Sequence, residues 1–219
     1  MSQRFADRRD AVRRLARALA HLAGTPGLLV LALPRGGVPV AYEVARALDA
    51  ELDLMLVRKL GTPGQPELAM GAIASGGVEV LNPRVVAALG IPDALIRETA
   101  RREYQELKRR EHAYRGDRPP PAIEGRTVIL VDDGLATGST MRAAVQALKT
   151  QNPARIVVAV PVAPPDTLAA LAEEVDEAVA LLTPDHFAAV GQWYHDFSQT
   201  SDQEVIELLQ KAWAAGQGA

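Results

Sequence analysis

The sequence contains no cysteine and few aromatic residues: two tryptophans, four tyrosines and three phenylalanines among 219 residues. The lack of cysteine excludes disulfide bonds, thiolate catalysis and cysteine-ligated zinc. Four histidines are present, but no two of them have the i, i+4 spacing of a helical metal pair. No apolar run approaches the roughly 18 residues of a membrane-spanning helix, and the charged N-terminus lacks the apolar segment of a signal peptide. These absences predict a cytoplasmic protein with no membrane partner.

Neither sign of charge dominates the chain. The 24 basic residues are balanced by 27 acidic residues, and the formal net charge is −3. We therefore expect no overall positive field that would attract a nucleic acid, and we predict no nucleic-acid partner. With 48% hydrophobic residues, the chain can bury a substantial core, and its length fits a single domain over residues 1–219.

Strand-like and helix-like segments alternate along most of the chain, which predicts an α/β fold with a mostly parallel sheet flanked by helices. Residues 68–81 have the pattern of a β-hairpin, and residues 82–121 that of a helical insertion with a long charged helix at 93–115. The alternating charges favour a solvated helix, and the sequence leaves open whether this helix packs against a second subunit in a homodimer. The predicted strands are 28–33, 52–57, 128–131, 155–160 and 175–182, and the other predicted helices are 7–23, 38–48, 139–149, 166–174 and 201–213.

The most informative stretch changes from apolar to acidic and then to small and polar within residues 128–141. Residues 128–131 are branched and apolar, which predicts a buried strand, and Asp132 and Asp133 follow it directly. Glycines and hydroxyl side chains then precede the helix predicted at 139–149, so free N–H groups would face an anion in this turn. Two carboxylates beside an anion site suit a ribose diol and a magnesium ion carried by the ligand. The alternative is an ordinary strand, polar loop and helix.

This stretch resembles the signature of the type I phosphoribosyltransferases, in the form of the adenine enzymes, which also have alanine at the place of Ala136. The resemblance implies that family's fold, with a core at about residues 25–182 and a small hood from residues 1–24 and 183–219. It implies that Asp132 and Asp133 are catalytic residues that hold the ribose hydroxyls of phosphoribosyl pyrophosphate (PRPP) and bind Mg²⁺. The loop around the 5-phosphate would consist of Gly134, Leu135, Ala136, Thr137, Gly138, Ser139 and Thr140.

A second glycine-rich turn, Pro34-Arg35-Gly36-Gly37, follows the first predicted strand. Glycines let a backbone approach an anion closely, and an arginine can contact it with two donors. The turn resembles the loop that binds the pyrophosphate of PRPP in the same family, where some members carry a strained or cis peptide, so we expect one near Arg35-Gly36. Taken alone, the turn is explained equally well as a flexible connection with an exposed arginine.

Residues 60–67 contain two glycines and two prolines without apolar periodicity, which predicts a loop. In the family, a flexible loop at this place closes over the reaction centre and excludes water, and a basic residue before it contacts phosphate. Lys59 and then Arg58 are the candidates for that residue. Glu67 is the candidate general base, because closure would desolvate its carboxylate and raise the pKa. The alternative is a plain surface loop.

Four of the aromatic residues lie within residues 187–197. Aromatic side chains in a loop after a strand can stack on a flat heterocycle. The segment resembles the Pro-Asp-x-Phe-Val-Val-Gly sequence of hypoxanthine-guanine phosphoribosyltransferases, which implies that Phe187 stacks on the base. Trp193 and Phe197 are expected instead to pin the C-terminal segment to the core. Asp196 resembles a downstream acid near magnesium in that family, but it stands one residue further from Gly191.

Together these features predict an enzyme that moves ribose 5-phosphate from PRPP to a nitrogen heterocycle, with Mg²⁺ as cofactor and pyrophosphate as product. Two departures from the hypoxanthine-guanine enzymes concern the base: Ala136 replaces their acidic residue, and no lysine occurs between Val157 and His186. The sequence therefore supports the ribose phosphate half of the ligand better than the base. The alternatives are a non-catalytic sensor of PRPP or nucleotide, and a domain that acts with a hydrolase partner.

Overall fold

A five-stranded parallel sheet forms the body of the protein in the computed structural model, which describes residues 4–216. Its order is β2-β1-β6-β7-β8, and every neighbouring pair is parallel. All residues of β1 and β6 are buried, as expected for strands that are covered on both faces. The predicted parallel sheet is confirmed. The strands are β1 (Leu29–Ala32), β2 (Glu51–Leu54), β6 (Thr127–Val131), β7 (Arg155–Val162) and β8 (Glu177–Leu182).

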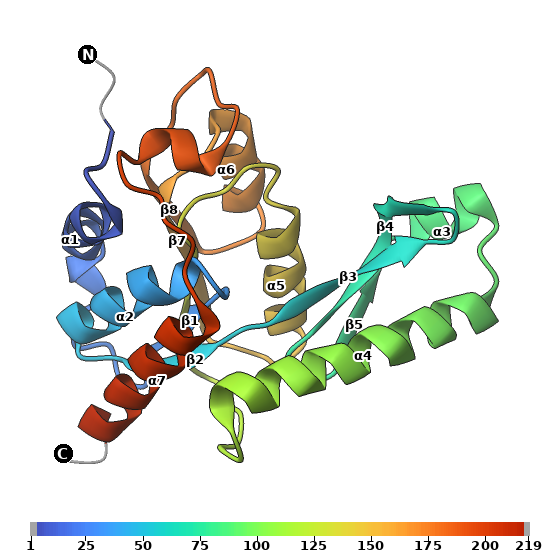
Figure 1. Cartoon of the computed structure of the whole chain (residues 1–219), viewed down its shortest axis with the longest axis horizontal. Helices are drawn as coiled ribbons and strands as arrows, with labels where there is room; N and C mark the ends of the chain where they lie inside the picture. The colour runs from blue at the N-terminus through green and yellow to red at the C-terminus, as the bar shows by residue number, and fades with distance from the viewer. Residues whose placement is uncertain (1–3, 217–219) are drawn as a thin grey trace.

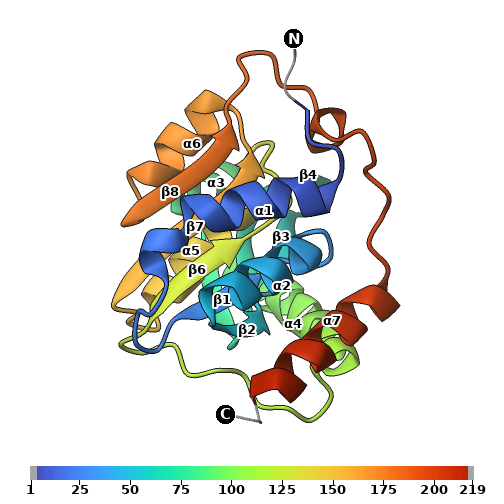
Figure 2. The same ribbon diagram turned by 90° about the vertical axis from the view of Figure 1, so that its left-hand side faces the viewer.

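Helices cover both faces of this sheet (Figures 1 and 2). One face packs against α1 (Arg8–Ala18), α2 (Gly37–Leu48) and α7 (Asp202–Gly216). The opposite face packs against α5 (Ser139–Lys149) and α6 (Pro165–Ala172). Figure 2 shows α1 and α2 in front of the sheet, and the segment after β8 runs along one side of the body to α7. Because β1 and β6 are neighbours in the parallel sheet, their carboxyl ends lie beside each other.

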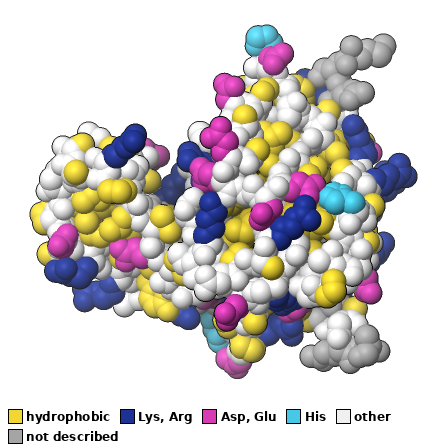
Figure 3. All heavy atoms as spheres, turned by 180° about the vertical axis from the view of Figure 1, so that it is seen from behind, with side chains coloured by type: hydrophobic (Ala, Val, Ile, Leu, Met, Phe, Trp, Pro, Cys, Tyr) yellow, Lys and Arg dark blue, Asp and Glu magenta, His cyan; other side chains and the backbone are white. Residues whose placement is uncertain are grey.

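A second, antiparallel sheet extends from the body as an arm (Figures 1 and 3). It consists of β3 (Val57–Thr62), β4 (Gln65–Ala74) and β5 (Val78–Leu81), and α3 (Pro83–Leu89) and α4 (Asp93–Arg115) complete the arm. The strand predicted at 52–57 is therefore divided, because the backbone of Leu56 leaves the parallel sheet and donates to Ser75 Oγ at 2.9 Å. Although α4 has 23 residues, no helix within residues 4–216 is both long and apolar enough to cross a membrane.

The loop predicted at residues 60–67 is wrong. The chain forms a tight hairpin there: β3 ends at Thr62 and β4 begins at Gln65, and the Thr62 hydroxyl donates to Gln65 O at 2.7 Å. Gly64 supplies the positive φ of 77° that the turn requires. Leu60 and Thr62 are buried and alternate with more exposed residues, so the segment has a strand pattern that the glycines and prolines obscured.

A buried ion pair joins the arm to the body. Arg115, at the end of α4, donates to Asp53 Oδ1 of β2 from Nε at 3.1 Å and from Nη2 at 2.7 Å. The side chains of Arg115 and Asp53 are 4% and 1% exposed, and Asp53 Oδ2 has no hydrogen-bond partner among the described residues. Burial raises the pKa of Asp53, and the charge of Arg115 opposes that rise. The orientation of α4 against the sheet therefore depends on the ion pair between Arg115 and Asp53.

Candidate functional site

Two acids end the central strand β6 and form the centre of the site. The backbone N–H of Asp133 donates to Asp132 Oδ1 at 2.8 Å, and the Asp133 side chain is 14% exposed. Burial raises the pKa of Asp132, and the neighbouring Asp133 carboxylate raises it further. Burial also raises the pKa of Asp133, whereas the guanidinium of Arg8 opposes that rise. The pair is thus short of positive partners and suited to hydroxyl donors or a cation.

The Arg35 turn packs directly on these acids. A cis peptide joins Pro34 and Arg35, close to the position expected from the sequence. A β-carbon on Gly36 would lie 2.1 Å from Asp133 Oδ2, and one on Gly37 would lie 2.7 Å from Val131 O. Neither position has room for a side chain. The turn after β1 and the acids after β6 are therefore one surface, although about a hundred residues separate them in the sequence.

We expect Gly36→Ala to lower the free energy of unfolding by about 1–3 kcal/mol, the usual cost of inserting a methyl group where no space exists. The measurement is urea denaturation beside Gly216→Ala, because a β-carbon at Gly216 would meet no atom within 4 Å. The control is expected to stay within about 0.5 kcal/mol of the wild type. Equal stability of the two variants would show that the turn can move away from Asp133 at no cost.

The loop between β6 and α5 is the turn in which the sequence predicts an anion site. Leu135 N donates to Val162 O at 2.9 Å, and Thr167 Oγ1 donates to Ala136 O at 3.0 Å, so neighbouring elements hold the loop from outside. Gly138 has a positive φ of 73° and precedes α5. Thr137 Oγ1 accepts from Ser139 N, the first N–H group of α5, at 3.4 Å. The N–H groups that follow it, with exposed Ser139 and Thr140, are available to an anionic group.

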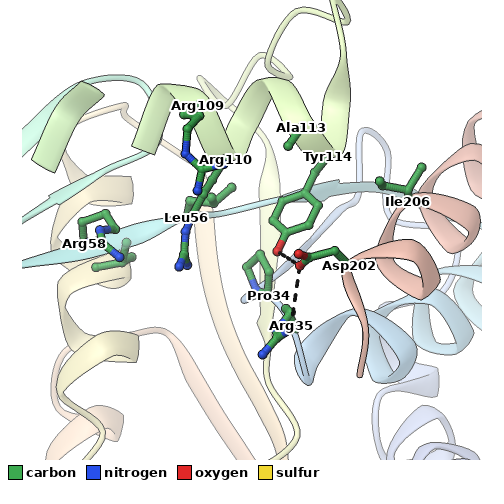
Figure 4. A pocket seen from close by; sticks show the side chains of 11 residues that line it. Pro34, Arg35, Leu56, Arg58, Arg109, Arg110, Ala113, Tyr114, Asp202 and Ile206 are labelled. Atoms are coloured by element: carbon green, nitrogen blue, oxygen red, sulfur yellow. Dashed lines mark hydrogen bonds and ion pairs between the residues drawn. The ribbon is translucent and has the colours of Figure 1, made fainter. Parts of the chain in front are cut away.

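A basic cleft of about 300 Å³ lies beside the Arg35 turn (Figure 4). Its lining includes four arginines: Arg35, Arg58 of β3, and Arg109 and Arg110 of α4. The sequence pattern had predicted that Arg109 and Arg110 belong to a solvated face. Arg109 and Arg110 share one carboxylate, that of Glu106. The cleft thus contains guanidinium groups from three elements. They lie close together only because the arm packs against the body, so the sequence alone does not show the cleft. Asp202 closes one side, since it accepts from Tyr114 OH at 2.6 Å and lies 3.9 Å from Arg35 Nη1.

Lys59, predicted to contact phosphate from just before the closing loop, and Glu67, predicted to lie on that loop, occupy different strands of the arm. Lys59 is exposed on β3 and lines a wider cleft of about 630 Å³ that also includes Thr140 at the start of α5. Figure 3 shows the hollow between the arm and the body. Glu67 is exposed on β4, close to the hairpin turn, and lines neither cleft. Lys59 and Thr140 therefore border the same cleft, and Glu67 borders neither cleft.

The aromatic segment after β8 is divided between two groups. Phe187 stacks with Trp193, with ring centroids 6.3 Å apart and an interplanar angle of 20°. Tyr194 packs against Phe197 at 5.1 Å, and its hydroxyl donates to Asp133 O at 2.5 Å. Tyr194 was not predicted as a site residue, because the sequence does not show that the segment returns to β6. Asp196 accepts from Ser198 N at 3.1 Å, a local contact that does not involve the acid pair.

Comparison with known proteins gives consistent matches. Residues 4–198 match the family described as phosphoribosyl transferase domain. A Mycobacterium tuberculosis protein provisionally named a phosphoribosyl transferase is 49% identical over 208 residues, which are 95% of this chain and 47% of that protein. The chain therefore spans about half the length of this relative. A uracil phosphoribosyltransferase from Lactobacillus gasseri is 33% identical over 147 residues, 63% of this chain and 65% of the enzyme. The crystal structure of TT1426 from Thermus thermophilus has a TM-score of 0.84 and 47% identity, covering 95% of this chain and 98% of that one.

Proposed function

Because the chain belongs to the phosphoribosyl transferase family, we propose that it transfers ribose 5-phosphate from PRPP to a nitrogen heterocycle and releases pyrophosphate. The observation that carries this proposal is the contact of the Arg35 turn with the acid pair, since Gly36 lies against Asp133. An anion bound at this turn, a phosphate at the start of α5 and a sugar over the acids would then belong to one ligand. We place the reaction in nucleotide salvage in the cytoplasm, with a nucleobase as acceptor.

In this proposal each element binds one part of PRPP. Asp132 and Asp133 accept hydrogen bonds from the two ribose hydroxyls, and residues 134–140 hold the 5-phosphate. Arg35, Gly36 and Gly37 bind the pyrophosphate, with Arg58 and Lys59 on the arm side. The bond from C1 to the pyrophosphate oxygen breaks as a ring nitrogen of the acceptor bonds to C1, and pyrophosphate leaves with the bonding electrons. The proton of that nitrogen passes to a general base, for which Glu67 is the candidate. The carboxylates stabilise the positive charge that develops on the ribose.

Magnesium fits this arrangement as a cation carried by the substrate. Within residues 4–216, no three histidine, cysteine or acidic side chains form a group that could by itself hold a metal ion. Mg²⁺ is commonly bound by one or two carboxylates together with substrate phosphates, and Asp132 and Asp133 supply that number. When bound, the ion would offset the negative charge of the pyrophosphate.

The acceptor is proposed to stack on Phe187. The Phe187 ring is half-buried and stacks on Trp193 in the segment after β8. Trp193 therefore holds the Phe187 ring in place, and the other face of that ring is proposed to stack on the acceptor. The similarity to a uracil phosphoribosyltransferase makes a pyrimidine a reasonable acceptor to test beside the purines. Glu67 as general base would require the arm to close toward the acids, because Glu67 is exposed near the hairpin turn and lines neither cleft.

The test is isotope-labelled PRPP with Mg²⁺, offered to a panel of purines, pyrimidines and small nitrogen heterocycles. We expect pyrophosphate release and labelled nucleotide with at least one acceptor. Tight binding of PRPP without transfer to any acceptor would contradict the enzyme and favour the non-catalytic sensor.

We expect Arg110→Met to weaken the binding of inorganic pyrophosphate with magnesium by about tenfold, the usual effect of losing a hydrogen bond to a charged group. The reason is that Arg110 lines the basic cleft beside Arg35. Calorimetric titration measures the effect, and Arg101→Met, an exposed arginine of the same helix outside the cleft, is the control. Equal affinities of both variants would exclude Arg110 from the pyrophosphate site.

A further inference from the structure

The first residue of α1, Arg8, contacts the acid pair from the N-terminal end of the chain. Its Nη2 donates to Asp133 Oδ2 at 3.2 Å and its Nε at 3.4 Å, while its Nη1 donates to Ser198 O at 2.6 Å. Both charged side chains are only 14% exposed. The contact is thus unlike a solvated ion pair, whose partners move freely and contribute little.

One aromatic ring, that of Phe197, stacks on this guanidinium. The Arg8 Cζ lies 4.3 Å from the centre of the Phe197 ring, and Phe197 packs on Tyr194, which bonds to the backbone of Asp133. A planar guanidinium is suited to stacking and to several directed hydrogen bonds at once. The Asp133 carboxylate, the Phe197 ring and the Ser198 carbonyl therefore fix the orientation of the Arg8 guanidinium.

Backbone hydrogen bonds hold the two chain segments together at this point. Phe5 N donates to Trp193 O at 2.9 Å, His195 N donates to Phe5 O at 2.9 Å, and Asp196 N donates to Ala6 O at 3.1 Å. The chain before α1 and the segment after β8 are thus paired beside the acids. Movement of either segment would carry Arg8 or its partners with it.

The contacts divide the carboxylate oxygens into used and available ones. Asp132 Oδ1 accepts from the backbone, and Asp133 Oδ2 accepts from Arg8. The two carboxyl groups contact each other, and no other donor within residues 4–216 reaches the second oxygen of either acid. Two neighbouring acceptors therefore remain, which matches the two neighbouring hydroxyls of a ribose.

We propose that Arg8 is a positioning residue of the ribose site: it fixes the Asp133 carboxylate so that its second oxygen faces the sugar, and it couples this orientation to the docked segment around Ser198. This role rests on the proposed function, because it concerns the same ligand. Arg8 does not contact the reacting atoms, and it acts through Asp133.

The test compares Arg8→Ala, Arg8→Lys and the control Arg14→Ala. Arg14 lies on the same helix and its Cζ is 5.0 Å from the Phe5 ring, so its loss removes a similar stacking contact without affecting an acid. We expect Arg8→Ala to lower kcat/KM for PRPP by about 10- to 100-fold, the usual cost of removing a group that orients a ligating side chain. Arg8→Lys should lie between Arg8→Ala and wild type, and Arg14→Ala should match wild type.

Two further readouts separate positioning from folding. Millimolar methylguanidinium should restore part of the turnover of Arg8→Ala and leave Arg14→Ala unchanged, because only the first variant has lost a guanidinium beside the site. Ribose 5-phosphate binding, followed by calorimetry, should weaken in Arg8→Ala and remain unchanged in Arg14→Ala. If Arg8→Ala does not fold, Arg8→Lys is measured in the same two assays.

The outcomes distinguish this inference from the proposed function. If the wild type transfers ribose phosphate and the Arg8 variants do so equally well, the positioning role is overturned and the transferase remains. If the wild type transfers nothing but Arg8→Ala still binds ribose 5-phosphate less tightly, the transferase is overturned and the positioning role remains. Ribose 5-phosphate affinity that is the same in the wild type and both Arg8 variants overturns the inference in either case.

Discussion

Asp133→Asn is expected to lower the rate of pyrophosphate release from PRPP by at least about 100-fold, the size of effect seen when one electrostatic contact to a transition state is removed. The amide keeps the shape of the carboxylate but removes the negative charge that would stabilise the developing positive ribose. It also places a donor where either Arg8 or a ribose hydroxyl requires an acceptor, because Asp133 Oδ2 already pairs with Arg8.

The control for this variant is Asp49→Asn. Asp49 is exposed and has a positive φ of 51°, a conformation that asparagine tolerates well. Pyrophosphate release and thermal stability are measured for both proteins. A release rate for Asp133→Asn close to that of Asp49→Asn would remove Asp133 from the reaction.

Arg115→Met is expected to lower the free energy of unfolding by about 3–5 kcal/mol, because breaking a buried ion pair leaves a charge without compensation. Asp53 is 1% exposed and already has one oxygen without a partner among the described residues. Without the guanidinium, the raised pKa of Asp53 rises further, and protonation then relieves the cost. The stability lost in Arg115→Met should therefore be smaller at acidic pH and larger as the pH rises.

Urea denaturation measures this loss, and Arg46→Met is the matched control. Arg46 pairs with Glu43 at 3.5 Å, but its side chain is 71% exposed, so its loss should cost less than about 1 kcal/mol. The double variant Arg115→Met with Asp53→Asn should recover part of the stability, since the uncompensated charge is gone. A loss in Arg115→Met no larger than in Arg46→Met would show that the ion pair does not hold the arm.

The sheet and its helices could be predicted from the sequence because buried parallel strands are continuous apolar runs. Residues 128–131 and 155–160 contain little else, and the helices between them have clear apolar faces. The type I phosphoribosyltransferase fold implied by the acid motif is confirmed. The hairpin predicted at residues 68–81 is confirmed by the pairing of β4 and β5. The hairpin of β3 and β4 was missed because Pro63 and Gly64 are typical of a loop, whereas a two-residue turn also requires such residues.

The site residues that follow strand ends could be predicted from the sequence, whereas the arginines that helices contribute could not. Asp133 and Gly36 follow neighbouring parallel strands, and topology alone brings such positions together. Arg8 lies at the start of a helix whose other arginines are mostly exposed, so its pattern resembles that of a solvated face. Arg110 was missed for the same reason, since helical periodicity does not show what lies across from a helix in space.

The pairing of residues 5 and 6 with residues 193–196 also sets when the site can exist during protein synthesis. Chains emerge from the ribosome with their N-terminal part first. The acids, the Arg35 turn and α1 are therefore made long before Ser198, which accepts a hydrogen bond from Arg8. A nascent chain that ends before this segment lacks the Phe197 and Ser198 contacts of Arg8, so prematurely terminated products should bind PRPP less tightly than the finished protein is proposed to do.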